Sequence, residues 1–362
     1  MVELKNPISL KNFIRLVESV ALMQKKPKWK ILCLLSDLKT STELESRLKN
    51  FSFMLEKKGD ILEISKEIKD PAYIFKAYIF HYKKLLLFAS NEKKEDINSY
   101  FVKDFLRKVK NLYYMWIPKK NIEDLIKRFK IKYQDFIVTE FHAERLGNEH
   151  FEAHFREKTN RKMTYSGSDG LEVLKEHKYY YGVRPYLVDI NIINKSSFRI
   201  NKNGYFNYDS GEFQFLLDTI QTIHDNLKYI LKPTMGTHYF EEILEEINIP
   251  ILNVQPIIAK LKNFNLNTNN IEYFADILKE SGFEIFNQIV IEGSINLNCD
   301  IIDTEKKAIF NVSSGGKELI ITPQYDTTFD TIMSFLEVLN EKIDAEIDYS
   351  LYKHAYIIEE QV

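Results

Sequence analysis

The chain has 362 residues, of which 44% are hydrophobic and 13% aromatic. It is too long for one ordinary domain and too apolar for a disordered chain, so we expect two or three folded domains. No apolar run approaches the roughly 20 residues of a membrane helix, and the first residues lack an apolar signal segment. Cys33 and Cys299 lie far apart in apolar stretches. We therefore expect a cytoplasmic, intracellular protein with no membrane partner and two buried, reduced thiols.

The net charge of −2 hides an uneven distribution. Residues 1–232 carry 42 Lys and Arg against 30 Asp and Glu, whereas residues 233–362 carry 8 against 22. This split favours DNA or another polyanion as the partner of the first part, and a second protein subunit as the partner of the acidic part. A dipolar protein without a partner fits the same numbers.

Residues 1–95 are expected to form a helical domain. Apolar side chains recur at helical spacing over 8–22, and a second helix is expected over 29–38. Thr40 and Glu43 then have the spacing of a capping box, which predicts the start of a third helix.

A turn at Gly59 leads into a short expected strand over 61–64. Two helices, a glycine turn and a strand form the outline of a winged helix, and a plain helical bundle fits equally well. A strongly apolar helix is expected over 74–88, followed by a linker over 89–99.

The rest of the chain has the pattern of one helix–antiparallel sheet–helix unit used twice. Asn121-Ile122-Glu123 and Asn270-Ile271-Glu272 each begin an amphipathic helix. Each helix is followed by a strand, then by a pair of strands with a turn, then by a closing helix. The expected strands are 135–143, 186–193 and 196–208 in the first unit and 284–295, 308–312 and 318–322 in the second. The alternative is a chance recurrence of helix–strand patterns.

These patterns predict an α+β protein with four further parts after residue 95. The first unit occupies 100–232 and contains a polar, basic insert over 144–184. A helical spacer follows at 233–269, the acidic second unit at 270–345, and a tail at 346–362. A sheet with helices on one face leaves its other face open, so two such units would present a wide, curved surface.

Short motifs in both units resemble the TATA-binding-protein fold. Ala308-Ile309-Phe310 is followed by a turn ending at Lys317 and by a strand over 318–322. In the first unit, Phe198-Arg199-Ile200 precedes Lys202-Asn203-Gly204. With its N-terminal helices and helical spacer, the arrangement is similar to the large subunit of the poxvirus intermediate transcription factor and to other viral TATA-binding-like proteins. The resemblance covers about residues 121–343.

The resemblance implies a DNA-binding factor in transcription initiation, with Phe310 in the position of a wedge that enters the minor groove. The second unit departs from that pattern because it is strongly acidic and would repel phosphate. The turn after Phe310 has an extra residue, and the tandem Phe pairs of true TATA binders are not clear. This unit is therefore a candidate for binding protein instead of DNA.

Basic residues interleaved with aromatic ones are typical of nucleic-acid contacts. They are dense over 103–133 and in the insert, and we expect 158–184 to be a flexible basic loop that makes the main contact. The candidate nucleic-acid-binding side chains are Lys127, Arg128, Lys130, Lys132, Arg156, Lys158, Arg161, Lys162, Lys178, Arg184, Arg199 and Lys202, together with Phe310. The alternative is a solvated helix face over core aromatics.

Signals for catalysis are weak. His150 and His154 have the spacing of a helical metal pair, but the metalloprotease pattern is absent. Arg145 and His150 have the spacing of HEPN ribonucleases, which requires a helix that Gly147 disfavours. Neither glycine-containing segment, 166–170 or 313–317, completes a phosphate-binding loop.

We therefore expect a non-enzymatic nucleic-acid-binding factor without a metal or cofactor. The alternatives are a nuclease that uses the Glu/His cluster at 140–154, and a scaffold subunit that docks through its acidic half.

Overall fold

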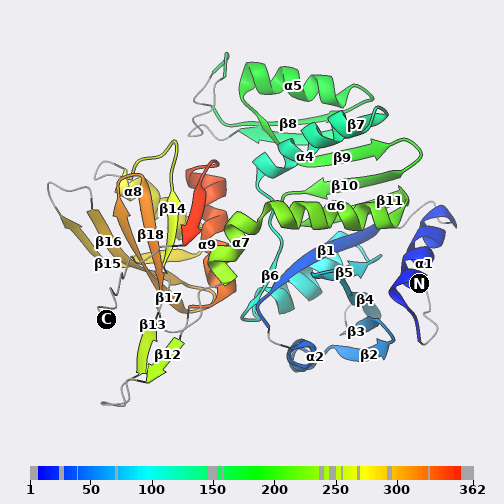
Figure 1. The fold of residues 1–362 in the computed structure, drawn as a ribbon, viewed down its shortest axis with the longest axis horizontal. Helices are drawn as coiled ribbons and strands as arrows, with labels where there is room; N and C mark the ends of the chain where they lie inside the picture. The colour runs from blue at the N-terminus through cyan, green and yellow to red at the C-terminus, as the bar shows by residue number, and fades with distance from the viewer. Residues whose placement is uncertain are drawn as a thin grey trace, which may run out of the picture. The chain divides into compact units, whose positions relative to one another are not determined.

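The computed structural model describes residues 7–23, 28–38, 40–69, 72–145, 153–156, 159–235, 240–243, 250–253, 256–266, 270–291, 296–324 and 327–351. The protein is mixed α+β, with antiparallel sheets (Figure 1). It divides into two compact units, Met1–Asn226 and Leu227–Val362. The first unit continues across residues 95–100, where a boundary was expected. The change in charge was expected after residue 232, six residues beyond this division. Only two charged residues lie between the two positions, Lys228 and Lys232, so the first unit remains basic and the second acidic.

Within its described residues, the first unit contains an 11-stranded sheet in the order β2-β3-β4-β5-β1-β11-β10-β9-β7-β8, with β6 also pairing with β1. Its strands are β1 (Trp29–Ser36), β2 (Met54–Lys58), β3 (Ile61–Lys69), β4 (Ala72–Tyr82), β5 (Leu85–Ser90), β6 (Leu112–Tyr114), β7 (Phe136–Arg145), β8 (Arg161–Ser166), β9 (Arg184–Ile192), β10 (Ser196–Asn201) and β11 (Tyr205–Gly211). Its helices are α1 (Leu10–Met23), α2 (Ser41–Asn50), α3 (Lys94–Asp96), the π-helix η1 (Ile97–Leu106), α4 (Lys119–Lys132), α5 (Gly170–Tyr181) and α6 (Phe213–Asn226).

Strand β1 is the centre of this sheet. It pairs in antiparallel fashion with β5 on one side and with β11 and β6 on the other. Its sequence, WKILCLLS, is almost wholly apolar because both of its faces are covered. The helix expected over 29–38 is therefore wrong: a short apolar run fits a buried strand as well as a buried helix.

Helices α1 and α6 cover the same face of the sheet. The ring of Phe13 on α1 packs against Trp29 of β1 and Phe80 of β4. Trp29 lies opposite Tyr208 of β11, whose ring contacts Phe213 at the start of α6. Side chains directly opposite each other in antiparallel strands share a face, so both helices lie on that side.

Helices α2 and η1 cover the other face beside β1–β5. One core cluster joins Leu44 of α2 and Phe101 of η1 to Leu32 of β1 and Phe88 of β5. Leu32 lies three positions after Trp29, and alternation along a strand puts the two on opposite faces. The two four-strand meanders that flank β1 thus carry their helices on opposite sides of one continuous sheet. This unit therefore does not have the single open face expected from the sequence.

Two further expectations for the N-terminal part are wrong. The apolar stretch 74–88 is a hairpin of β4 and β5, which turns at Lys83 with a positive φ of 53°. Residues 89–99 are not a linker, because they complete β5 and begin α3 and η1, where Ile97 is fully buried. The helix expected over 29–38, which was part of the winged-helix and bundle outlines, is therefore a strand, and the later expected helix over 74–88 is a pair of strands. The third helix is confirmed: Thr40 caps α2 by accepting the backbone N–H of Glu43.

The second unit has a sheet in the order β15-β16-β17-β18-β14-β19 and a hairpin of β12 and β13. Its described elements are α7 (Lys228–Met235), β12 (Phe240–Ile243), β13 (Pro250–Asn253), β14 (Ile257–Lys260), α8 (Ile271–Glu280), β15 (Phe283–Ile291), β16 (Asn296–Asp303), β17 (Ala308–Gly315), β18 (Glu318–Pro323), α9 (Phe329–Val338), the π-helix η2 (Leu339–Ile343) and β19 (Asp348–Leu351). Where it is described, the region 233–269 consists mainly of strands after the end of α7, so the expected helical spacer is wrong.

The repeated order of elements is found, and it occurs three times among the described helices and strands. In the second unit, strand β14 and helix α8 precede the meander β15–β18 and helix α9, and β14 returns beside β18. Strand β1 and helix α2 precede β2–β5 and η1 in the same way, and β1 returns beside β5. In the third case, helix α4 precedes the strands β7, β9, β10 and β11 and the helix α6. Strand β8 and helix α5 are inserted after β7, and β1 lies beside β11. The N-terminal copy is the one that the sequence motifs did not reveal.

Candidate nucleic-acid interface

The insert between β7 and β9 forms a strand and a helix. Strand β8 extends the sheet by pairing with β7, and its residues alternate between half-buried and exposed. Gly170 begins α5 where any Cβ would lie 2.4 Å from the carbonyl oxygen of Val138, and Gly182 ends the helix in the left-handed conformation. The flexible loop expected over 158–184 is thus ordered from residue 159 onward.

A pocket of about 630 Å³ lies between β8, the C-terminal half of α5 and the segment around Arg156. Four of its lining residues carry basic side chains: Arg156, Arg161, Lys162 and His177. The described lining residues are Arg156, Thr159, Asn160, Arg161, Lys162, Met163, His177, Tyr181 and Val183. No carboxylate is among these described lining residues, so none of them balances the positive charge that the four basic side chains of this basic pocket carry.

The ring of Tyr181 organises the basic pocket. The guanidinium carbon of Arg161 lies 4.2 Å from its centroid, and the imidazole of His177 stacks on it at 5.5 Å and 22°. Nε of Arg161 and Nδ1 of His177 are buried and have no hydrogen-bond partner among the described residues. Because an unsatisfied buried polar group is costly, both atoms are suited to face an acceptor such as a phosphate oxygen.

A second group of cations lies where α4 passes α5. The ammonium of Lys130 on α4 is close enough to that of Lys175 on α5 to lower the pKa of Lys175. On the same helix, Lys127 pairs with Asp124 at 3.1 Å, and Arg128 donates to Oδ1 of Asn226 at 3.1 Å.

These α4 side chains are exposed, as is Lys132, whose ammonium lies 5.4 Å from the ring centroid of Tyr133. The sequence candidates on α4 therefore form an exposed basic strip that is separate from the residues of the basic pocket. They are Lys127, Arg128, Lys130 and Lys132.

Four other candidates are neutralised by acids. Lys178 and Arg184 both contact Glu123, at 2.6 and 3.4 Å. Arg199 lies 2.6 Å from both Glu140 and Asp189 on the sheet face away from α4 and α6. These three cations are therefore engaged in ion pairs that hold the unit together.

Lys202 is the fourth. It contacts Glu144 at 2.9 Å, and Lys119 contacts the same carboxylate at 3.2 Å. Burial alone would raise the pKa of Glu144, but the two ammonium groups lower it below its usual value of 4.5. Sequence spacing gave no sign of these acidic partners, because they come from other strands and helices.

Phe310 does not lie where a wedge must lie. It is fully buried in the second unit, with its ring 4.8 Å from Phe335 and 6.2 Å from Phe283. The expected insertion of this side chain between bases is therefore wrong: the alternation of β17 directs it into the core.

The proposed nuclease cluster at 140–154 is only partly described, because Glu149, His150 and Glu152 lie outside the described residues. The candidate phosphate contact Lys158 lies outside them as well. Arg145 ends strand β7, so it is not on the helix that the ribonuclease spacing requires. The ring of His154 lies 4.2 Å from that of Tyr179, tilted by 36°. Among the described residues, no group of three or more His, Cys, Asp and Glu side chains could hold a metal ion.

Both cysteines are free and buried, as expected. Burial raises the pKa of both thiols, that of Cys299 to about 12. None of the helices in the described parts of the chain is both long and apolar enough to cross a membrane.

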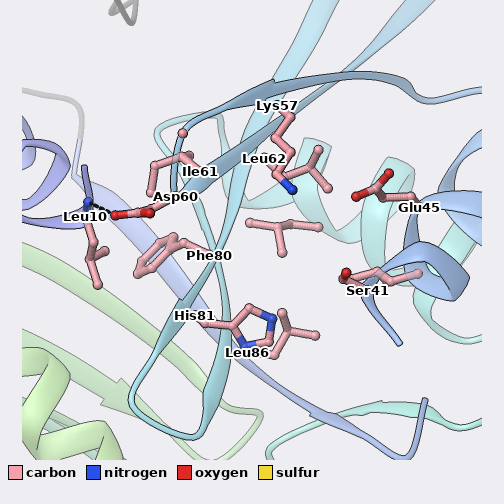
Figure 2. A pocket seen from close by; sticks show the side chains of 13 residues that line it. Leu10, Ser41, Glu45, Lys57, Asp60, Ile61, Leu62, Phe80, His81 and Leu86 are labelled. Carbon is pink, nitrogen blue, oxygen red and sulfur yellow. Dashed lines mark hydrogen bonds between the residues drawn. The ribbon is translucent and has the colours of Figure 1, made fainter. Parts of the chain in front are cut away.

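A second pocket, of about 440 Å³, lies at the ends of β2–β5. Figure 2 shows Ser41 and Glu45 of α2 on one side of it and Leu10 and Asp60 on the other, with His81 below. The Asp60 carboxylate accepts the backbone N–H of Leu10 at 2.9 Å, so it caps α1. Acidic, basic and apolar side chains are mixed here, and no single ligand chemistry is favoured.

Comparison with known proteins points to the region of the basic pocket. A family profile described as a middle domain matches residues 120–203, from α4 to the turn after β10. An uncharacterized protein of Archaeoglobus fulgidus is 26% identical over 102 residues, which is 28% of each chain. The chain thus matches little more than a quarter of that relative's length. Every residue that lines the basic pocket lies within 120–203.

Proposed function

We propose that this protein is a non-enzymatic nucleic-acid-binding factor that holds phosphate groups in the basic pocket. The observation that carries the proposal is the convergence of Arg156, Arg161, Lys162 and His177 on one cavity, with no carboxylate among its described lining residues. Guanidinium groups match phosphate geometry and stay charged at any physiological pH. Lys130 and Lys175 extend the positive surface along α4 and α5.

A role in transcription initiation forms the finer part of this proposal. Its support is the helix–sheet–helix order that repeats through the chain, together with the motifs that resemble TATA-binding proteins. The acidic second unit is assigned to a protein partner, because its 8 basic against 22 acidic residues after position 232 disfavour phosphate.

Salt dependence of binding tests the proposal. Log K for a duplex DNA should fall linearly with log[salt], with a slope of about 0.9 per phosphate contact. The triple variant Arg156→Ala/Arg161→Ala/Lys162→Ala should bind more weakly and flatten the slope by about two to three units. Lys57→Ala/Lys69→Ala/Lys84→Ala removes the same charge from exposed positions remote in sequence and should leave most of the slope. Equal effects of the two triple variants would contradict a defined site, and salt-independent binding would favour the scaffold alternative.

The nuclease alternative is tested with the same protein. Single- and double-stranded DNA and RNA are incubated with Mg²⁺, Mn²⁺ or Zn²⁺, and we expect no cleavage. Cleavage that His150→Ala or His154→Ala abolishes would make the nuclease reading correct.

A further inference from the structure

Three large aromatic side chains stand exposed beside the basic pocket. Phe155, Tyr179 and Tyr180 are 52%, 60% and 43% exposed. The backbone N–H of Phe155 donates to the carbonyl of Tyr180 at 3.0 Å, which fastens this segment to the end of α5. The rings of Phe155 and Tyr180 lie 5.7 Å apart at 29°. We refer to Phe155, Tyr179 and Tyr180 as the aromatic platform.

The aromatic platform is continuous with the basic pocket. Tyr181, which carries Arg161 on its ring, directly follows the platform tyrosines and lies 6.1 Å from the ring of Phe155. Arg156, which lines the pocket, directly follows Phe155. A ligand that places an anionic group in the pocket therefore has exposed rings within reach of its neighbouring groups.

Exposed rings beside cations favour one form of nucleic acid. A duplex hides the faces of its bases, so it offers phosphate to the pocket and nothing to the rings. An unpaired strand offers both, because every base has a π-face that stacks on an aromatic side chain without regard to sequence. The four basic residues of the pocket, which have no carboxylate among their described neighbours in the lining, complement the charged backbone of such a strand.

We infer that this site takes single-stranded nucleic acid, with a phosphate in the basic pocket and adjacent bases stacked on the aromatic platform. The inference rests on the proposed function, since it names the form of nucleic acid that the pocket binds. DNA and RNA share this chemistry, and both are included in the test.

The test compares 12-nucleotide single strands of DNA and RNA with the matching DNA duplex by fluorescence anisotropy at one salt concentration. The full chain should bind a single strand at least tenfold more tightly than the duplex. Phe155→Leu/Tyr179→Leu/Tyr180→Leu keeps apolar bulk but removes the rings. It should weaken single-strand binding by at least about tenfold, because the stacking of bases on the rings is lost, and leave duplex binding unchanged.

An abasic single strand of the same length is the decisive control, because it keeps the phosphates and lacks the bases. The unmodified protein should lose about as much affinity for it as the ring variant loses for the normal strand, and the ring variant should lose little more. Equal affinity for single strand and duplex, or unchanged single-strand binding by the ring variant, would overturn the inference. The proposed function would survive that result if Arg161→Ala/Lys162→Ala still weakened binding.

An acidic peptide with aromatic residues is the competing occupant. A random Glu/Tyr copolymer serves as its probe at matched total charge. It should compete with the single strand poorly, and the ring variant should leave its weak binding unchanged. Tighter binding of the copolymer than of either single strand would assign the site to a protein partner and overturn the inference.

Discussion

Lys130 of α4 and Lys175 of α5 lie side by side, and the ammonium of Lys130 lowers the pKa of Lys175. Two neighbouring ammonium groups repel each other, so the interaction between them does not stabilise the fold. It lies between two helices that belong to the region matched by the family profile. A bound phosphate would relieve the repulsion, which makes the pair a test of function separate from the pocket.

We expect Lys130→Gln to separate stability from binding. The variant should unfold at the same temperature as the unmodified protein or slightly above it, because the repulsion is lost. Its single-strand salt slope should fall by up to about 0.7, the value for one phosphate contact. Thermal unfolding and anisotropy measure the two effects, with the exposed Lys69→Gln as control. A lower unfolding temperature with unchanged binding would show that Lys130 is structural.

Glu144 gives the first unit an acid-sensitive ion pair. Its folded pKa is lowered by Lys119 and Lys202, so its contribution is complete above pH 4.5 and is lost as pH falls through the lowered pKa. Glu144→Gln should destabilise by about 3 kcal/mol at pH 7. The difference from the unmodified protein should shrink below pH 4.5.

Urea unfolding between pH 7 and pH 3 measures the effect of Glu144→Gln. The exposed Glu67→Gln is the control and should change little. A cost for Glu144→Gln that did not vary with pH would mean that its charge is not the source of the stabilisation.

Phe13 tests whether α1 is an integral part of the first unit. Its fully buried ring packs on Trp29, Tyr78 and Phe80. Phe13→Ala should cost about 3–5 kcal/mol through lost burial and a cavity. Leu22→Ala on the same helix, at a side chain that is 79% exposed, should cost little. Equal urea midpoints for the two variants would contradict the docking of α1.

Gly204 tests the turn between β10 and β11. Its φ is +71°, and a Cβ there would lie 2.3 Å from the carbonyl oxygen of Met115. Gly204→Ala should therefore destabilise the first unit by at least about 1–3 kcal/mol. A Cβ at Gly315 would meet nothing within 4 Å, so Gly315→Ala is the matched control. Thermal unfolding distinguishes the two, and similar losses would mean that the turn tolerates a side chain.

Features that depend on residues close together in the sequence were predicted correctly. The cap at Thr40, the amphipathic helix α4 and the repeated element order were all readable from spacing. The apolar runs that form β1 and the β4–β5 hairpin were not, because uniform apolarity reports burial on both faces and not periodicity. Aromatic and β-branched content favoured a strand over 72–82, but the tight turn at Lys83 carries no glycine to mark it.

In the basic pocket, too, some residues could be predicted from the sequence and others could not. Arg156, Arg161 and Lys162 were predicted from charge as part of a basic insert, and the fold brings them to one pocket. His177 and Tyr181 complete that pocket but come from the next helix, so only the fold brings them together. Arg199 and Lys202 carry the same charge in sequence, yet acids from β7 neutralise them. Pairing across strands decides which cations remain available, and sequence separation hides it.

The central position of β1 has a consequence for synthesis on the ribosome. Its β5 edge can pair as soon as residue 90 has emerged, and β6 can pair with Leu34–Ser36 on the opposite edge soon afterwards, but the part of that edge at Trp29–Leu32 waits for residues 205–208 of β11. An apolar strand with an open edge is a template for pairing with other chains. The nascent N-terminal segment therefore passes through a long interval in which it is prone to aggregation, and chaperone dependence should end abruptly once β11 has left the exit tunnel.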